Sequence, residues 1–429
     1  MIEQFVDVSP ELLALDAEVM AGLAPQLLEI DRTKEYNQLA MLRAFTECGV
    51  AANHLQNSTG YGYDSAARDK LEQVFAALTG SEAALFGHGF ASGTHTLAVA
   101  LFGVLRPGDE LLCATGRPYD TLHGVIGLSE SQNAAGPPAA LGGGSLADFG
   151  IRYRQLELTA EGAPDLAAIT AAAPGARMLY LQRSRGYAAR PTLSLGDIEA
   201  AAQAARAANP GILVMVDNCY GEFVHTEEPT HRGADLMAGS LIKNPGGGIA
   251  PCGGYIAGRA DLVDLCAQRL TAPGVGGEVG CVPGDILRQL WLGLYFAPAV
   301  TAEAMKTGAY ATALFGRLGY AVSPGPGEVR QDIITAITLG GPEKLVALCR
   351  AIQKNSPVDS HLTPEPWPMP GYDCDVIMAA GAFTQGSSIE LSCDAPMRPP
   401  YTAYLQGSLN FAGGRAAILS AAGAVFGGS

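Results

Sequence analysis

Short apolar runs of the kind that form buried strands alternate with helical patterns between about residues 81 and 258. The runs are Ala83–Phe86, Glu110–Ala114, Met178–Gln182, Ile212–Asp217 and Gly253–Ala257, and helices are predicted from Ser92, over 120–127 and over 195–208. Such alternation is typical of a largely parallel sheet covered by helices on both faces. Because ligands of these sheets gather at the carboxyl ends of the strands, we expect the functional site at that edge.

The flanking regions have different patterns. Helical spacing predicts two helices between Pro10 and about His54, the second starting at the charged cluster 31–35. After Asp285, a long helix interrupted near Pro298 is followed by strands and helices that do not alternate regularly. The expected elements there are strands at Tyr320–Val322, Asp332–Ile337, Val376–Ala379 and Ser388–Leu391, a helix over Pro342–Ile352 and a final helix. These patterns divide the chain into an N-terminal helical arm (1–56), a large α/β domain (57–285) and a smaller α+β C-terminal domain (286–429).

Composition narrows the classes of function. With 48% hydrophobic and 16% charged residues, the 429-residue chain can bury a large core. A net charge of −15 argues against nucleic acid or an anionic membrane as partner. The nine cysteines show no CxxC pairs, so neither a disulfide framework nor a metal site is indicated. Without a signal-peptide pattern or a long apolar segment, we expect a cytoplasmic protein that binds small molecules and copies of itself.

The most informative pair of residues is Asp217 and Lys243. Asp217 ends an apolar strand, and Lys243 follows it after a short interval. A lysine that forms a Schiff base needs a desolvated pocket, and a carboxylate beneath a pyridine ring keeps the ring nitrogen protonated. Taken alone, Asp217 is better explained as an N-cap or salt-bridge partner at the end of a strand, and Lys243 as a surface lysine. Together they predict a site for pyridoxal phosphate.

Three further segments fit such a site. The run Ser92-Gly93-Thr94 follows a strand and a glycine-rich turn, where backbone N–H groups at a helix start attract a phosphate. Ser92 is alternatively a simple N-cap. Ser240, three residues before the lysine, can reach the same phosphate. Tyr119 follows a strand and can stack on a flat cofactor, although a core tyrosine is an equal alternative.

Two glycine-rich segments lie outside this constellation. The loop over 272–280 has more backbone freedom than a connector needs, which suggests a lid, a subunit contact or a mobile loop without a role. The insert over 131–145 is rich in Gly, Ala and Pro and predicts a surface loop.

Taken in order, these motifs resemble the Cys/Met-metabolism family of fold-type-I pyridoxal-phosphate enzymes, which includes cystathionine lyases and methionine gamma-lyase. Four longer segments are similar to a subgroup of that family called methionine gamma-lyase-like or "aluminium resistance protein". They are Thr59–Asp64, Gln182–Tyr187, Lys243–Gly248 and Pro396–Tyr401.

The resemblance implies a role for each matching residue: Lys243 as Schiff-base lysine, Asp217 as partner of the pyridine nitrogen, Tyr119 as stacking residue and acid, Ser92, Gly93, Thr94 and Ser240 as phosphate ligands, and Asn218 as a neighbour of the cofactor. It also implies a homodimer or homotetramer in which Tyr61 and Tyr63 reach the neighbouring subunit's site. The wider family has a Tyr-x-Arg motif there, whereas this chain has Tyr61-Gly62-Tyr63 and lacks the arginine. Ile242 also stands where cystathionine lyases carry a threonine.

The leading prediction is a pyridoxal-phosphate-dependent carbon–sulfur lyase that catalyses β- or γ-elimination on a substituted amino acid. A planar guanidinium suits the substrate α-carboxylate, and Arg398 is the first candidate, with Arg185 second. The same cofactor supports γ-replacement, elimination of halide, or transamination. A non-enzymatic, cofactor-binding stress-response protein is the remaining alternative.

Overall fold

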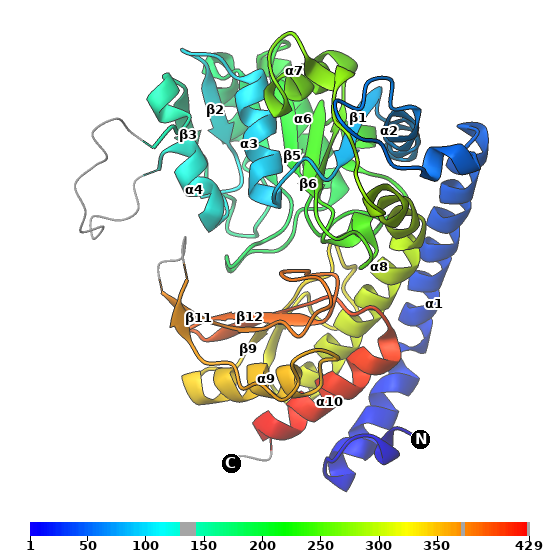
Figure 1. The fold of residues 1–429 in the computed structure, drawn as a ribbon. Helices are drawn as coiled ribbons and strands as arrows, with labels where there is room; N and C mark the ends of the chain where they lie inside the picture. The colour runs from blue at the N-terminus through cyan, green and yellow to red at the C-terminus, as the bar shows by residue number, and fades with distance from the viewer. Residues whose placement is uncertain (129–142, 370–373, 427–429) are drawn as a thin grey trace.

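The computed structural model describes residues 1–128, 143–369 and 374–426. Figure 1 shows two layered units with a long N-terminal helix running along both of them. The first unit is built on a seven-stranded sheet and the second on a six-stranded sheet. The predicted fold class, a mainly parallel α/β domain with a smaller α+β domain, is confirmed. The predicted surface loop over 131–145 falls mostly outside the described residues.

The large sheet is parallel over most of its width. In spatial order its strands are β1 (Ala83–Gly87), β7 (Gly254–Gly258), β6 (Leu236–Ser240), β5 (Leu213–Asp217), β4 (Met178–Gln182), β2 (Glu110–Cys113) and β3 (Arg152–Gln155). All pairings from β6 to β3 are parallel, while β7 runs antiparallel to both β6 and β1. The five predicted strands are present, and β3 and β6 are additional.

Helices cover both faces of this sheet because its strands are apolar on both sides. Along β4, Leu179 and Leu181 pack into one core, whereas Met178 and Tyr180 pack into another. The first core is covered by α2 (Ala66–Thr79), α5 (Leu166–Ala172) and α6 (Leu195–Ala208). The second is covered by α3 (Gly93–Val104), α4 (Asp120–Ile126) and α7 (Ala260–Leu270).

Two predicted helix breaks are absent. The N-terminal region forms one helix, α1 (Pro10–Glu47), which continues through Pro25, and α8 (Ile286–Arg317) continues through Pro298. The prediction of two N-terminal helices and of a break near Pro298 is therefore wrong. The second N-terminal helix was predicted to start at the charged cluster 31–35, and Pro298 removes one backbone hydrogen bond from α8. However, α1 and α8 pack on one another in a shared core that includes Leu23 and Ile30, and Asp31 of the cluster forms an ion pair with Lys306 of α8 (2.8 Å). That tertiary packing outweighs the local signal.

The C-terminal sheet is antiparallel and lies beneath the large domain in Figure 1. Its strands are, in spatial order, β10 (Trp367–Pro368), β11 (Asp375–Ala379), β12 (Ser392–Pro396), β13 (Thr402–Gln406), β9 (Thr335–Thr338) and β8 (Ala321–Ser323). The helices α9 (Pro342–Lys354) and α10 (Phe411–Phe426) cover the face turned away from the large domain.

One strand prediction in this domain is wrong. The run Ser388–Leu391 is buried but irregular, and the strand begins only at Ser392. The reason is Glu390, whose carboxylate accepts hydrogen bonds from the backbone N–H groups of Phe383 (2.8 Å) and Thr384 (2.9 Å). These bonds fold the chain back on itself instead of leaving it extended. Within the described ranges, every helix is too short or too polar to cross a membrane.

Candidate active site

A cavity lies between the carboxyl ends of the large-domain strands and the C-terminal sheet. The large domain contributes Gly93, Thr94, Tyr119, Ser184, Tyr187, Asp217, Tyr220, Ser240 and Lys243, among others. The C-terminal domain contributes Met378, Gly386, Ser387, Ser388, Ser392, Asp394, Tyr404 and Gln406, among others. The cavity therefore stands where the strand pattern predicts a ligand.

Lys243 enters the cavity from a segment that is tightly packed against its surroundings. The residue follows β6 and starts a 3₁₀ turn (Asn244–Gly246). The Asn244 side chain donates to the backbone carbonyls of Tyr220 (3.0 Å) and Glu222 (2.9 Å). A Cβ on Gly247 would lie 2.4 Å from the carbonyl oxygen of Gly293 in α8. Glycine is thus required after the lysine, because α8 packs directly on this backbone.

The Lys243 amine is surrounded by groups that determine its charge. Its Nζ lies 3.9 Å from the ring centroid of Tyr220, a cation–π distance. Burial by itself lowers the pKa of this amine. The neighbouring acidic groups, among them the carboxylate of Asp217, outweigh that effect and raise the pKa above its ordinary value. Tyr220 has a left-handed backbone (φ 73°), so its placement beneath the lysine costs conformational energy that the surroundings must supply.

Asp217 lies at the carboxyl end of β5, beside the lysine. Its side chain is buried and accepts hydrogen bonds from the Tyr180 hydroxyl (3.4 Å) and the Cys219 backbone N–H (3.1 Å). Burial raises the pKa of the Cys219 thiol and of the Tyr180 hydroxyl, so both stay neutral. Asp217 is therefore held by neutral donors and remains available to a cationic partner in the cavity.

The N-terminus of α3 faces Ser240 across a narrow gap. Gly93 and Thr94 line the cavity, and a Cβ on Gly93 would lie 3.3 Å from the Cβ of Ser240. A larger residue than glycine would thus fill the space between the helix start and the serine. Ser92 has the alternative role considered above, because its Oγ accepts from the His95 N–H (3.1 Å) and caps the helix.

Tyr119 lines the cavity at the start of α4. Its backbone N–H donates to the Gln182 side chain (2.6 Å), which ties the tyrosine to the end of β4. Its ring packs edge-on against Tyr187, with centroids 5.6 Å apart. Tyr119 thus lies in the cavity, as the stacking role requires.

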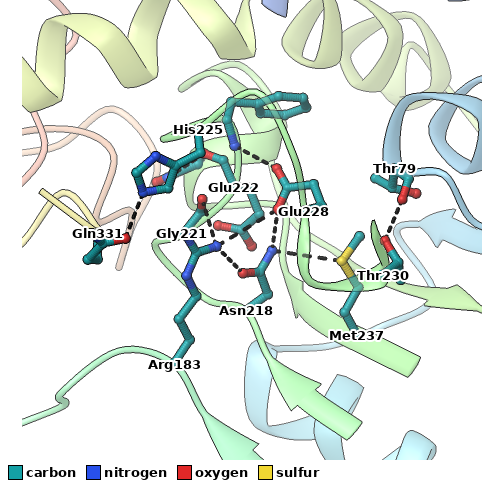
Figure 2. Close-up of polar contacts among 12 residues, drawn as sticks. Thr79, Arg183, Asn218, Gly221, Glu222, His225, Glu228, Thr230, Met237 and Gln331 are labelled. Atoms are coloured by element: carbon teal, nitrogen blue, oxygen red, sulfur yellow. Dashed lines mark hydrogen bonds and ion pairs between the residues drawn. The ribbon is translucent and has the colours of Figure 1, made fainter. Parts of the chain in front are cut away.

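Asn218 lies next to Asp217 in the chain but points into a different environment. Figure 2 shows its side chain in a buried polar network with Arg183 and Glu228. Asn218 Oδ1 accepts from Arg183 Nη1 (2.7 Å), and its Nδ2 donates to Glu228 Oε2 (2.8 Å). Glu228 also accepts from the Phe223 N–H (2.8 Å). Asn218 does not line the cavity and instead fixes the loop that presents Tyr220.

The same network contains an acid that burial keeps protonated. Glu222 accepts from the Tyr255 hydroxyl (2.7 Å), and its Oε2 has no hydrogen-bond partner among the described residues. Burial raises the pKa of Glu222 to about 8. The fully buried Arg183 therefore relies on Glu228, 4.0 Å away, as its charged partner. The loop that Asn218 fixes should therefore lose stability when the charge of either Arg183 or Glu228 is removed.

The C-terminal half of the cavity is built by strand alternation. Cys393 and Leu405 point into the core with α9 and α10, so their neighbours Asp394, Tyr404 and Gln406 face the cavity. Sequence reasoning assigned no function to these three residues. The feature of the sequence that could have identified them is the alternation of core-facing and cavity-facing residues within β12 and β13, and neither strand was predicted correctly.

The two arginines proposed for the substrate carboxylate do not line the cavity, but both lie close to it. Arg185 is 4% exposed, and its buried Nε has no hydrogen-bond partner among the described residues. Burial raises the pKa of Tyr404, and the positive charges of Arg185 and Arg398 oppose that shift. Both arginines are thus close enough to Tyr404 for their charges to act on it.

Tyr61 and Tyr63 lie away from the cavity, on the surface. They are 71% and 63% exposed, and their rings stack with centroids 5.3 Å apart. The glycine-rich segment 272–280 packs beside them, since the Gly280 N–H donates to the Tyr61 carbonyl (2.9 Å) and Arg68 donates to the carbonyls of Gly277 and Gly280. The two segments form one surface feature.

Comparison with known proteins identifies the family. The methionine gamma-lyase family model matches residues 13–426. The protein YnbB of Bacillus subtilis strain 168 is 45% identical over 413 residues, which cover 96% of each chain. The crystal structure of a carbon–sulfur lyase involved in aluminium resistance from Clostridium novyi NT has 43% identity and a TM-score of 0.90, covering 97% of this chain and 96% of that one.

The fold extends to more distant proteins. The pyridoxal-5'-phosphate-dependent protein YhfS of Escherichia coli shares the fold at 18% identity, with a TM-score of 0.59 over 91% of this chain and 95% of that one. These matches confirm the predicted family, subgroup and enzyme class. The chain belongs to the methionine gamma-lyase family of pyridoxal-phosphate-dependent carbon–sulfur lyases.

Proposed function

We propose that this chain binds pyridoxal phosphate through Lys243 and eliminates a sulfur-bearing group from Cβ or Cγ of an amino acid. The observation that carries the proposal is the juxtaposition of Lys243, Asp217 and the α3 N-terminus around one cavity. Lysine supplies the covalent attachment and a carboxylate suits the pyridine nitrogen. The helix N-terminus, with the glycine gap opposite Ser240, suits the phosphate.

The bound cofactor would withdraw electrons from the substrate Cα when that carbon loses its proton. The chain's own residues do the rest. In its neutral form, Lys243 Nζ would remove the Cα proton and return it elsewhere on the substrate, because it reaches the cavity over the Tyr220 ring. Asp217 would keep the pyridine nitrogen of the bound cofactor protonated, and Tyr119 would stack on its ring and serve as acid for the leaving group.

The substrate α-carboxylate is assigned to Arg185 rather than Arg398. A buried guanidinium with an unpaired Nε gains a charged partner when a carboxylate binds, whereas it is costly to leave unsatisfied. Arg185 lies in the chain between Ser184 and Gly186, which both line the cavity, and this position favours it for the substrate carboxylate.

We also propose that the chain works as a homodimer or a tetramer of dimers. The exposed Tyr61 and Tyr63 would then complete the site of the neighbouring subunit. Leu39 and Leu42 on α1 and Phe296 on α8 are also exposed, and the Gln38 side chain bonds the Tyr295 carbonyl (3.0 Å), so these apolar groups share one face. A mass in solution equal to that of a single chain would contradict this part of the proposal.

The lyase proposal is tested with the protein loaded with pyridoxal phosphate. Methionine, homocysteine, cystathionine, cysteine and γ-substituted amino acids are supplied separately, and 2-keto acid, ammonia and the released thiol are measured. Equal amounts of the three products from at least one amino acid support elimination. Keto acid that appears only when a second keto acid is added would instead indicate transamination.

A further inference from the structure

The C-terminal wall of the cavity carries a carboxylate whose position is fixed from both domains. Asp394 Oδ2 accepts hydrogen bonds from the Tyr187 hydroxyl (3.1 Å) of the large domain and from Gln406 Nε2 (2.7 Å) of β13. Oδ1 has no hydrogen bond within the part of the chain that the structure describes. One oxygen is thus held in place, while the other is available to a ligand in the cavity.

The described lining of the cavity contains fewer cationic than anionic side chains, so Asp394 has no cation there that pairs with it alone. Among its described lining residues, the charged side chains are Asp217, Asp394 and Lys243. The segments 129–142 and 370–373 contain no lysine or arginine. Burial raises the pKa of Asp394, and the hydrogen bonds from Gln406 and Tyr187 and the charge of Lys243 oppose that shift only in part. A buried carboxylate in this situation is stabilised by a cation that enters the site.

We infer that Asp394 recognises a positively charged group on the side chain of the substrate, so that the preferred substrates are thioether amino acids with a second ammonium group. This inference rests on the proposed function. The α-amino and α-carboxylate groups are assigned to the Lys243 and Arg185 side of the cavity, and a carboxylate repels a second carboxylate placed near Asp394. A distal ammonium is the group that pairs with Oδ1.

A matched pair of substrates tests the inference. S-(2-Aminoethyl)-L-cysteine and S-propyl-L-cysteine have the same length, and an ammonium in the first replaces a methyl group in the second. The wild-type holoenzyme should favour the aminoethyl compound in kcat/KM by roughly 10- to 100-fold, the range for a hydrogen bond to a charged group. Asp394→Asn should remove most of this preference, so that the ratio of kcat/KM for the two compounds falls to within about threefold of one.

The matched control is Asp375→Asn, an exposed carboxylate on the neighbouring strand β11, which should keep the preference. Equal kcat/KM for the two compounds in the wild-type enzyme overturns the inference, and this result needs no variant. Equal losses on both compounds in Asp394→Asn also overturn it, because they indicate a structural role.

A binding measurement separates this inference from the lyase proposal. L-Lysine and L-norleucine have no leaving group, and they differ in chain end by an ammonium against a hydrogen. Calorimetric titration of the holoenzyme should show tighter binding of L-lysine, and Asp394→Asn should remove the difference. L-Lysine preference without elimination from any amino acid supports the inference and contradicts the lyase proposal. Elimination accompanied by tighter binding of L-norleucine supports the lyase proposal and contradicts the inference about Asp394.

Discussion

The two halves of the cavity are built by different means. In the large-domain half, the functional side chains stand at strand ends and helix starts: Asp217 ends β5, Lys243 follows β6, and Gly93 starts α3. In the C-terminal half, Asp394 and Gln406 lie within strands and project from the face of the sheet. The first arrangement fixes a few reacting atoms through the backbone. The second offers a surface on which side chains can vary without disturbing the strands. The cofactor chemistry is therefore assigned to the first half and the choice of substrate to the second.

The largest effect should come from the large-domain half. Lys243→Ala should lower kcat for elimination by about 10²- to 10⁴-fold, the usual contribution of a proton-transferring group. Lys344→Ala, which removes an exposed lysine on α9, is the matched control and should leave kcat unchanged. The rate of keto-acid formation at saturating substrate is the measurement. Full activity in Lys243→Ala would contradict the assignment of the cofactor chemistry to the large-domain half.

The buried network behind the same half should be the most sensitive part of the fold. Arg183→Met leaves Glu228 buried without its cation, and this should lower the free energy of unfolding by about 3 to 5 kcal/mol. Urea-induced unfolding gives the value. Arg317→Met, at an exposed pair with Glu18, should change it within error. A small effect at Arg183 would mean that the Asn218 loop is held by other contacts.

Variants of Arg185 and Arg398 should differ in how much they raise KM, because only one of the two arginines is proposed to bind the substrate α-carboxylate. Arg185→Met should raise KM by about 10- to 100-fold for every active amino acid, because a hydrogen bond from a charged donor is lost. The visible spectrum of the bound cofactor should stay the same. Arg398→Met is expected to have a smaller effect on KM. The opposite order would return the role to Arg398.

Stability should also depend on pH through Glu222. Its pKa is raised to about 8 in the folded protein, so between its ordinary range and pH 8 the folded state binds more protons than the unfolded state. Stability therefore falls as the pH rises through this window, by at most about 1.4 kcal/mol per pH unit from this group. Glu222→Gln should flatten the slope between pH 5.5 and 8 in urea unfolding. Burial also raises the pKa of Glu72 to about 8, so part of the slope should remain.

Sequence alone predicted the large-domain half well, for a physical reason. Its strands are apolar runs bounded by turn residues, and Asp217, Gly93 and Thr94 stand where those runs end. The lysine strand β6 was missed because Leu236–Ser240 combines small residues with only two large apolar ones. The continuity of α1 through the charged cluster 31–35 and of α8 through Pro298 was also missed, since both depend on packing between helices far apart in the chain. Asp394 could not be assigned without knowing which face of β12 meets the large domain.

The central claim is that Lys243 holds pyridoxal phosphate in this cavity. The direct test is borohydride reduction of the loaded protein, followed by proteolysis and mass spectrometry to locate the modified lysine. A single phosphopyridoxyl group is expected on the peptide that contains Lys243, and it should disappear in Lys243→Ala. Modification of another lysine, or none despite bound cofactor, would contradict the account.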